Sequence, residues 1–195
     1  MRLYIRLLTI LLLFPLVSTE AKENIEVFVH YTSTEGLSSD NIHDIAQDKH
    51  GFIWIATQYG LSRFDGQYFK NFLEKDYPSL LRNDFYHAYL LPNKEMTFAG
   101  GVIVSYNEET DSFDDLSENT QLYNFTSFSL LKDQNVIVTS DNDIFSYDSQ
   151  KKKIHPLWGK NYSHRILDFL QDPYGRYWIG SDSGIFLLKV GSINS

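Results

Sequence analysis

The chain has 195 residues, 43% of them hydrophobic and 22% charged, so it can bury a core and does not have the composition of a disordered protein. Its formal net charge of −8 argues against binding to nucleic acid, which needs a basic face, and against attraction to an anionic membrane. It has no cysteine, which excludes disulfides, thiolate metal sites and a cysteine nucleophile.

The first 21 residues have the order of a secretory signal peptide. A basic start containing Arg2 and Arg6 is followed by an apolar stretch over residues 7–17 and then by small residues up to Ala21. Crossing a bilayer needs about 20 apolar residues, so an uncleaved anchor is the less favoured alternative. We expect cleavage near Ala21, a periplasmic or otherwise exported mature chain, and no stable membrane insertion after cleavage.

A segment near the start of the mature chain recurs near its end. Residues 47–57 (QDKHGFIWIAT) align with residues 171–181 (QDPYGRYWIGS) at an offset of 124, which is three periods of about 41 residues. Weaker copies lie between them, at 85–106 and 136–148. Four-stranded units of about 40–45 residues are the blades of β-propellers. An all-β partial propeller over residues 22–195 is therefore predicted, since the alternative, a β-sandwich, leaves the repeat unexplained.

The prediction comprises four antiparallel four-stranded blades and one additional strand. The blades span approximately 38–72, 82–116, 122–157 and 163–190, and the extra N-terminal strand spans 25–32. Within the repeat, Asp48 can accept hydrogen bonds from the amides of a tight turn that Gly51 closes with a positive φ. Trp54 and Trp178 are expected to be core wedges between blades rather than ligand-stacking residues.

Three segments closely resemble the two-component regulator propeller repeat: FVHYT at 28–32, EGLSSDN at 35–41 and QDKHGFIWIATQYGLSRFDG at 47–66. The resemblance implies the N-terminal periplasmic sensor region of a hybrid two-component histidine kinase of gut bacteria. Such a sensor is built of large, typically seven-bladed propellers, acts as a dimer and detects polysaccharide breakdown products. An immunoglobulin-like domain, a membrane helix, a histidine kinase and a DNA-binding region would follow. We therefore interpret this chain as a fragment of such a sensor, without an enzymatic activity of its own.

Whether the propeller closes is open to two answers. The fourth blade shows three evident strands, so residues 26–31 could complete it and close a four-bladed ring. We expect instead an open arc in which residues 26–31 are not paired with residues 185–190. The reason is that repeats resembling those of larger rings would have to open their tightly packed interfaces to close so small a ring.

A propeller gathers loops from every blade around its axis, so we expect ligand contacts from residues that enter the innermost strands or lie between the second and third strands. These candidates are Asp40, Asn41, Gln58, Tyr59, Asn83, Asp84, Tyr123, Asn124, Asp141, Asn142, His164, Arg165 and Asp182. Amides, carboxylates, tyrosine and arginine suit hydroxyl-rich sugars, which favours an oligosaccharide ligand. The alternative is an assembly module without a small ligand, in which exposed blade faces bind a second copy or the remaining blades of a full-length sensor.

The sequence predicts no catalytic site, no metal site and no cofactor. The six histidines lack a paired metal-binding spacing. Residues 141–143 (DND) begin like a calcium loop, but the glycine and glutamate of that loop are missing. Asp44 and Asp168 occupy equivalent positions in two repeats, and they would have to lie within about 5–10 Å of each other to act as a glycosidase pair. The repeat explains them more simply as structural residues.

Overall fold

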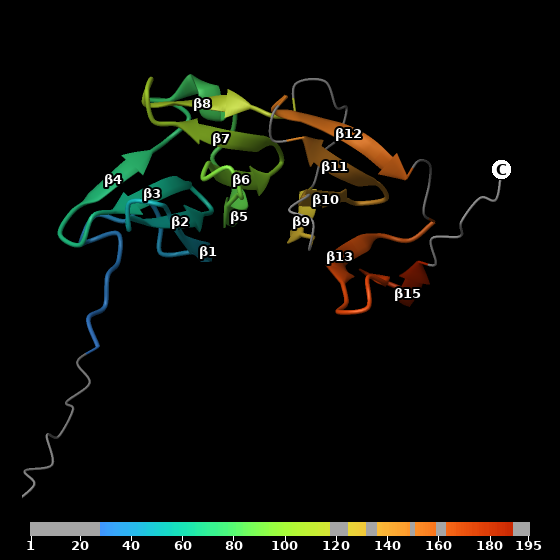
Figure 1. Ribbon diagram of the computed structural model, residues 1–195. Helices are drawn as coiled ribbons and strands as arrows, with labels where there is room; N and C mark the ends of the chain where they lie inside the picture. The colour runs from blue at the N-terminus through green and yellow to red at the C-terminus, as the bar shows by residue number, and fades with distance from the viewer. Residues whose placement is uncertain (1–27, 118–124, 132–135, 149–150, 159–162, 189–195) are drawn as a thin grey trace, which may run out of the picture. The chain divides into compact units, whose positions relative to one another are not determined.

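The computed structural model describes residues 28–117, 125–131, 136–148, 151–158 and 163–188. Over these residues the chain forms four separate antiparallel sheets and one short 3-10 helix, which confirms the predicted all-β architecture of propeller blades (Figure 1). Residues 31–195 form one compact unit, distinct from residues 1–30. In the described part of the chain, no helix has the length and apolar composition that a membrane crossing requires.

Strand order within each sheet follows the chain, as in a meander. The first sheet contains β1 (Ile42–Gln47), β2 (Ile53–Thr57), β3 (Gly60–Phe64) and β4 (Phe69–Phe72). After the 3-10 helix η1 (Pro78–Leu80), the second contains β5 (Phe85–Leu90), β6 (Met96–Gly100), β7 (Ile103–Asn107) and β8 (Ser112–Asp115). The third contains β9 (Phe125–Leu130), β10 (Val136–Ser140), β11 (Ile144–Asp148) and β12 (Lys153–Trp158). The fourth contains β13 (Ile166–Gln171), β14 (Tyr177–Ser181) and β15 (Gly184–Leu188).

The predicted N-terminal strand over 25–32 is not formed in its described part, residues 28–32. Local hydrogen bonds explain why, because the Thr32 amide donates to the Glu35 carboxylate at 2.7 Å and the Glu35 amide donates back to the Thr32 carbonyl at 3.0 Å. These bonds form a turn in place of a ladder. Residues 25–27 lie outside the described residues. Among the residues that are described, the first and fourth sheets share no strand.

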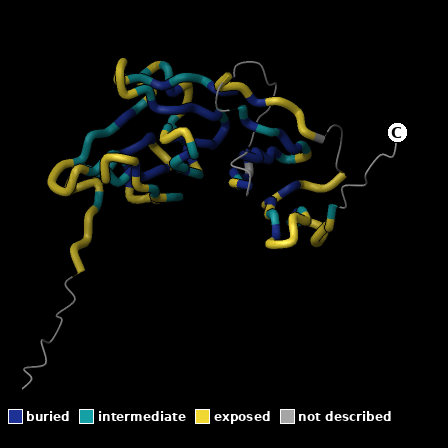
Figure 2. The backbone as a smooth tube through the Cα atoms, in the orientation of Figure 1, coloured by how far each residue is buried: buried dark blue, intermediate teal, exposed yellow. Residues whose placement is uncertain are grey.

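Trp54 is a wedge between the first and second blades, as predicted. Its side chain is fully buried, and its ring centroid lies 5.1 Å from that of Phe72, 5.0 Å from Phe98 and 4.9 Å from Tyr106. Trp178 at the equivalent position of the fourth blade is only half-buried. Figure 2 shows the same trend along the chain, with buried residues concentrated in the second and third sheets and exposed ones in the fourth.

The predicted turn chemistry is confirmed in the first blade. One Asp48 carboxylate oxygen accepts hydrogen bonds from the amides of His50 (2.9 Å) and Phe52 (3.0 Å). The other accepts from the Trp54 indole at 2.8 Å, and Gly51 closes the turn with a φ of 91°. The carboxylate therefore joins the turn to the core wedge. The fourth blade repeats the arrangement, with Asp172 accepting from the Trp178 indole at 3.0 Å.

Candidate functional site

A concave surface lies where the first strands of all four sheets approach one another. It forms an open cavity of about 650 Å³, and every blade contributes to its wall. The lining residues are Ile42, His43, Asp84, Tyr86, His87, Gly100, Gly101, Phe125, Arg165 and Leu167. Convergence of several sequence-distant segments on one hollow is typical of a ligand-binding surface.

A β-bulge interrupts the first strand of every sheet at the same place. In the first sheet Ile42 pairs with Thr57 and Asp44 with Ala56, which leaves His43 without a residue opposite it. The corresponding bulged residues of the four sheets are His43, Tyr86, Thr126 and Leu167. A bulge re-aims a side chain out of the regular alternation of a strand. Three of these residues, His43, Tyr86 and Leu167, line the cavity.

The bulged residues of the first two blades form a flat aromatic surface. The rings of His43 and Tyr86 are stacked, with centroids 4.6 Å apart and planes inclined by 13°. His43 Nδ1 lies 2.8 Å from the carbonyl oxygen of Phe85, which accepts a hydrogen bond when that nitrogen carries the proton. In the neutral imidazole, Nε2 is then an acceptor. Tyr86 is 48% exposed, so part of its side chain is accessible to a ligand.

Two oppositely charged side chains flank this aromatic surface. Asp84 accepts a hydrogen bond from Arg82 Nε at 3.0 Å, and Arg165 Nε donates to Asp141 at 3.1 Å. Each pair is substantially exposed, so both charges are hydrated and screened. Asp84 and Arg165 are the predicted site residues that line the cavity.

Other predicted site residues hold turns together within one blade. The Asn41 side-chain amide donates to the side-chain oxygen Oε1 of Gln58 at 2.9 Å. In the fourth blade the Asp182 carboxylate accepts from the Arg165 amide at 3.2 Å and lies 3.7 Å from His164 Nδ1. Each contact joins the residue before the first strand to the turn between the second and third strands.

A second group of predicted residues links one blade to the next. The Gly60 amide donates to the Asn83 carbonyl at 2.6 Å, and the Ile166 amide donates to the Asp141 carbonyl at 2.6 Å. The Asn83 side chain also accepts from the Glu74 amide at 2.8 Å. These polar residues therefore have structural partners at the blade junctions.

The remaining candidates are dispersed. Asp40 accepts from the Ser33 amide in the turn that precedes the first blade. Tyr59 and Asn142 are exposed in turns between second and third strands. Tyr123 and Asn124 lie outside the described residues.

Asp44 and Asp168, weighed as a glycosidase pair, have structural roles in their blades. Asp44 accepts from the amide of Ala88 in the second blade at 2.9 Å and from its neighbour Ile45 at 2.8 Å. Asp168 accepts from the Phe169 amide at 2.8 Å. The Asp44 carboxylate thus fastens the first blade to the second beside the cavity.

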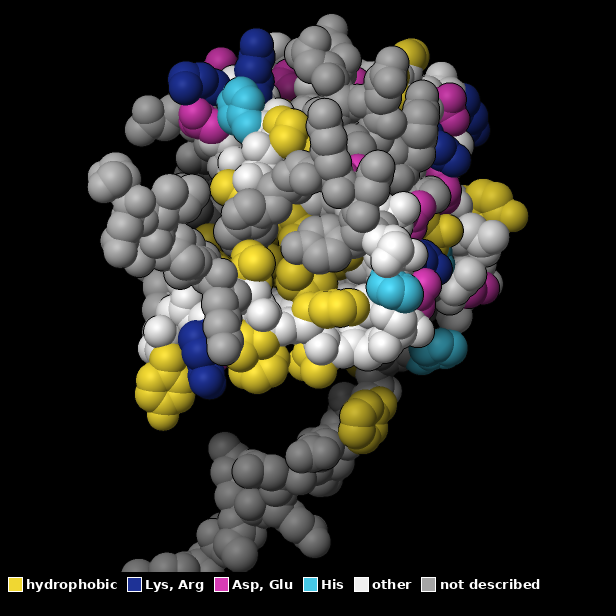
Figure 3. Space-filling view, turned by 90° about the vertical axis from the view of Figure 1, so that its right-hand side faces the viewer, with side chains coloured by type: hydrophobic (Ala, Val, Ile, Leu, Met, Phe, Trp, Pro, Cys, Tyr) yellow, Lys and Arg dark blue, Asp and Glu magenta, His cyan; other side chains and the backbone are white. Residues whose placement is uncertain are grey.

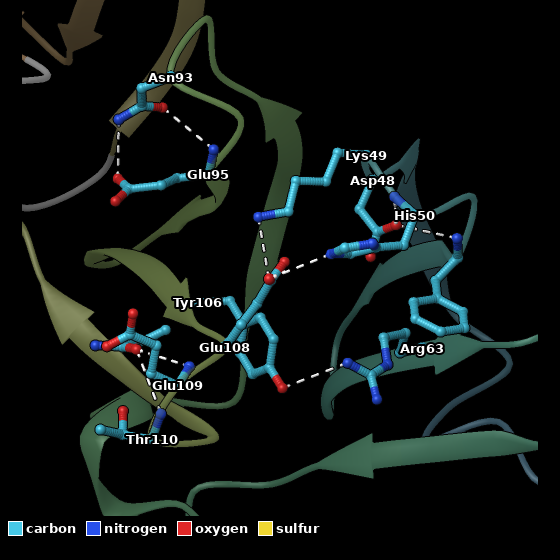
Figure 4. Close-up of polar contacts among 12 residues, drawn as sticks. Asp48, Lys49, His50, Arg63, Asn93, Glu95, Tyr106, Glu108, Glu109 and Thr110 are labelled. Carbon is cyan, nitrogen blue, oxygen red and sulfur yellow. Dashed lines mark hydrogen bonds and ion pairs between the residues drawn. The ribbon is translucent and has the colours of Figure 1, made fainter.

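Polar contacts also join the first two blades away from the cavity (Figure 4). The Glu108 carboxylate lies 3.0 Å from Lys49 Nζ and 3.2 Å from His50 Nε2. Burial alone would raise the pKa of Glu108, but hydrogen bonds from Lys49 and His50 hold that pKa below its ordinary value. Nearby, the Tyr106 hydroxyl accepts from Arg63 at 3.3 Å, and burial together with its bond to Asp111 raises the pKa of Tyr106 to about 12.

A family model matches parts of the two end blades. The family model described as two-component regulator propeller matches residues 36–59 and 163–183. A 61-residue stretch is 43% identical to histidine kinase P4 of Formosa agariphila, covering 31% of this chain and 4% of that protein. The chain therefore spans a small part of this curated relative.

Two groups of solved structures share the fold. The extracellular domain of a proposed hybrid two-component system of B. thetaiotaomicron aligns with a TM-score of 0.66 at 15% identity, covering 78% of this chain and 21% of that chain. Virginiamycin B lyase of Staphylococcus aureus aligns with a TM-score of 0.60 at 15% identity, covering 88% and 62%. At these identities the structures establish the propeller fold. The family model matches part of the first and part of the fourth blade, so these two segments are similar to the two-component regulator propeller repeat.

Proposed function

We propose that this chain is an extracytoplasmic sensor propeller of a two-component system and that its concave surface binds an oligosaccharide released by glycan breakdown. The observation that carries the proposal is the bulge at the same place in every first strand, which presents His43, Tyr86 and Leu167 to a shared cavity. Bulges are enriched beside functional sites, where they re-aim side chains.

The chemistry of the cavity supports a sugar ligand. The apolar face of a pyranose ring stacks on a flat aromatic surface, and the His43–Tyr86 pair provides one. Asp84 and Arg165 offer an acceptor and planar donors to ring hydroxyl groups. A cavity of about 650 Å³ has the size of a site for a small oligosaccharide.

Binding without turnover is the activity that we propose for this surface, although relatives of the fold include lyases. The carboxylates beside the cavity are already engaged, Asp84 by Arg82 and Asp44 by the Ala88 amide. A general base needs a carboxylate directed at its substrate.

Titration of the exported chain with a panel of oligosaccharides from different polysaccharide classes tests the proposal. Replacing Tyr86 by Ala should weaken binding about tenfold or more, since an exposed aromatic platform is lost. Tyr68→Ala, in the exposed turn between β3 and β4, is the matched control and should leave binding unchanged. Absence of binding across the panel, or equal losses in both variants, would contradict the proposal.

Export is tested separately. The predicted signal peptide, residues 1–21, lies outside the described residues, and the solved relatives that are extracellular domains support an exported location. The N-terminus of the mature protein should begin near Lys22. A mature chain that still begins at Met1 would contradict cleavage.

A further inference from the structure

The residue that follows the second strand differs in one blade from the other three. It is Gln58, Asp141 and Asp182 in the first, third and fourth blades, but Gly101 in the second. In those three blades its side-chain oxygen accepts a hydrogen bond from the residue just before a first strand. The second blade has no side chain there to do so, and Gly101 lines the cavity.

The guanidinium of Arg82 fills the space beside this glycine. A Cβ added to Gly101 would lie 2.4 Å from Arg82 Nη1 and 2.7 Å from Arg82 Nε, so any larger residue would push the guanidinium away. From this position Arg82 Nε donates to the Asp84 carboxylate at 3.0 Å. Asp84 is the acidic residue of the cavity wall, and the adjacent guanidinium offsets its repulsion of an anionic ligand.

Arg165, the basic residue of the cavity wall, uses only part of its guanidinium within the protein. Its Nε donates to Asp141 at 3.1 Å, and the side chain is 58% exposed. A guanidinium has five N–H donors, four of them on the two terminal nitrogens. Among the described residues these terminal nitrogens have no hydrogen-bond partner, so they can bind the two oxygens of a carboxylate side by side.

An anion would be held here by local hydrogen bonds and not by the overall charge of the protein. The net charge is −8, which repels anions at long range. Figure 3, the view from the side on which β13 and β15 lie in Figure 1, shows acidic and basic side chains next to one another at several places. The Asp182 carboxylate is also near Arg165, but it accepts from the Arg165 backbone amide and leaves the terminal nitrogens free.

We propose that the cavity is specific for an acidic oligosaccharide, with the carboxylate of a uronic acid bound by the two terminal nitrogens of Arg165. The His43–Tyr86 pair, which lines the same cavity, provides the flat surface for a sugar ring. Arg82 is a positioning residue that acts through Asp84. The inference rests on the oligosaccharide binding proposed above and adds the charge of the ligand to it.

The test compares uronic-acid oligosaccharides with their methyl esters, because esterification removes the charge and keeps the ring hydroxyl groups. The probes are galacturonate, glucuronate and mannuronate oligosaccharides, titrated calorimetrically into the mature chain. At least one acid should bind about tenfold or more tightly than its ester, as expected for hydrogen bonds to a charged group. In Arg165→Gln this ratio should fall to about one.

Two further variants separate Arg165 from a general effect of charge. Lys151→Gln removes a positive charge from an exposed turn outside the cavity and should keep the ratio of the unmodified chain. Arg82→Gln leaves Arg165 intact but removes the cation beside Asp84, so the acid should lose several times more affinity than the ester. An unchanged ratio in Arg82→Gln would contradict the role of Arg82.

The outcomes distinguish this inference from the proposal on which it rests. Equal binding of acids and esters, or a preference for the acid that persists in Arg165→Gln, would overturn the inference and leave sugar binding standing. If no oligosaccharide binds, whether acidic or neutral, both proposals are wrong. Thermal unfolding of each variant verifies that it is folded, so that a lost preference reports on the cavity.

Discussion

The turns between the first and second strands of the first two blades have the same backbone but different side chains. In the first blade the Asp48 amide donates to the Phe52 carbonyl at 3.0 Å and the Gly51 amide to the Asp48 carbonyl at 3.1 Å. In the second blade Leu91 and Lys94 make the two equivalent bonds at 3.0 and 2.8 Å. Lys94 also adopts the positive φ of Gly51, at 68°.

The difference shows that the turn aspartate and the tryptophan occur together in a blade. Blades with Asp48 or Asp172 in the turn have an indole that donates to the carboxylate, from Trp54 or Trp178. The inner blades have neither, since Leu91 and Leu131 replace the aspartate, and Thr97 and Ile137 replace the tryptophan. Without an indole donor a buried carboxylate is costly, and a leucine packs there instead. Backbone bonds define the turn, and the side-chain bond fastens it to the core.

Replacing the buried tryptophan should have the largest effect on stability. The size of this effect should differ between the first and the fourth blade. Trp54→Ala should lower the free energy of unfolding by about 3–5 kcal/mol, because a fully buried aromatic leaves a cavity. Trp178→Ala should cost clearly less, because its side chain is only half-buried. Urea unfolding of both variants measures the difference, and equal losses would contradict this explanation.

The hydrogen bond between Asp48 and Trp54 can also be removed by replacing the aspartate. Asp48→Leu should cost about 2 kcal/mol, since the indole N–H and two turn amides lose their acceptor. In a Trp54→Phe background the same change should cost less, because no buried indole donor remains. A double-mutant cycle measures this coupling, and additive losses would mean that the two residues act independently.

Substitutions at the turn glycines test the backbone conformation of the turn without removing a side-chain contact. Gly51→Val and Gly175→Val should each cost about 1–2 kcal/mol, since a β-branched residue is strained at φ values of 91° and 80°. No atom outside the turn crowds a Cβ at Gly175, so the loss reports conformation and not a clash. Lys94→Gly should be close to neutral, because relief of strain offsets the entropy of a glycine. Unchanged thermal melts for both valine variants would contradict the turn assignment.

The smallest expected effect is a pH dependence at Asp172. Burial alone would raise the pKa of this carboxyl, but hydrogen bonds from Trp178 and from the amide and guanidinium of Arg176 hold its pKa well below the ordinary value. A depressed folded-state pKa stabilises the fold above the unfolded-state pKa, and this stabilisation is lost as the pH falls. Between about pH 5 and pH 2, the free energy of unfolding should therefore fall less steeply in Asp172→Asn than in the unmodified chain. Identical slopes in the two proteins would exclude this role.

The same residues explain how far the sequence predicts the fold. Asp48, Gly51 and Trp54 are a local signature that the fourth blade repeats, so the period and the end blades could be recognised. The second blade keeps the turn with Leu91 and Lys94, which no glycine or aspartate pattern reveals, and only the strand spacing indicated that blade. The predicted N-terminal strand is not formed in its described part, where the Glu35 carboxylate accepts a hydrogen bond from the Thr32 amide that a ladder would need.

The cavity was harder to predict because a bulge has no sequence signature. Polar character drew attention to Asn41, Asn83 and Asp182, which the structure shows joining turns. His43 and Tyr86 lie within strands of ordinary alternation, and a single skipped partner is what directs them to the cavity. An unpaired residue of this kind can be recognised only when the pairing of the two strands is known.

The bulge involves two positions of the repeat that differ in how much their residue types vary. The residues just before the bulge are all large and apolar, namely Ile42, Phe85, Phe125 and Ile166. The bulged positions carry four unlike residues, namely His43, Tyr86, Thr126 and Leu167. Duplication of a blade thus copies a scaffold together with one position that has no residue opposite it. Each further copy therefore offers a separate choice of side chain at the bulged position.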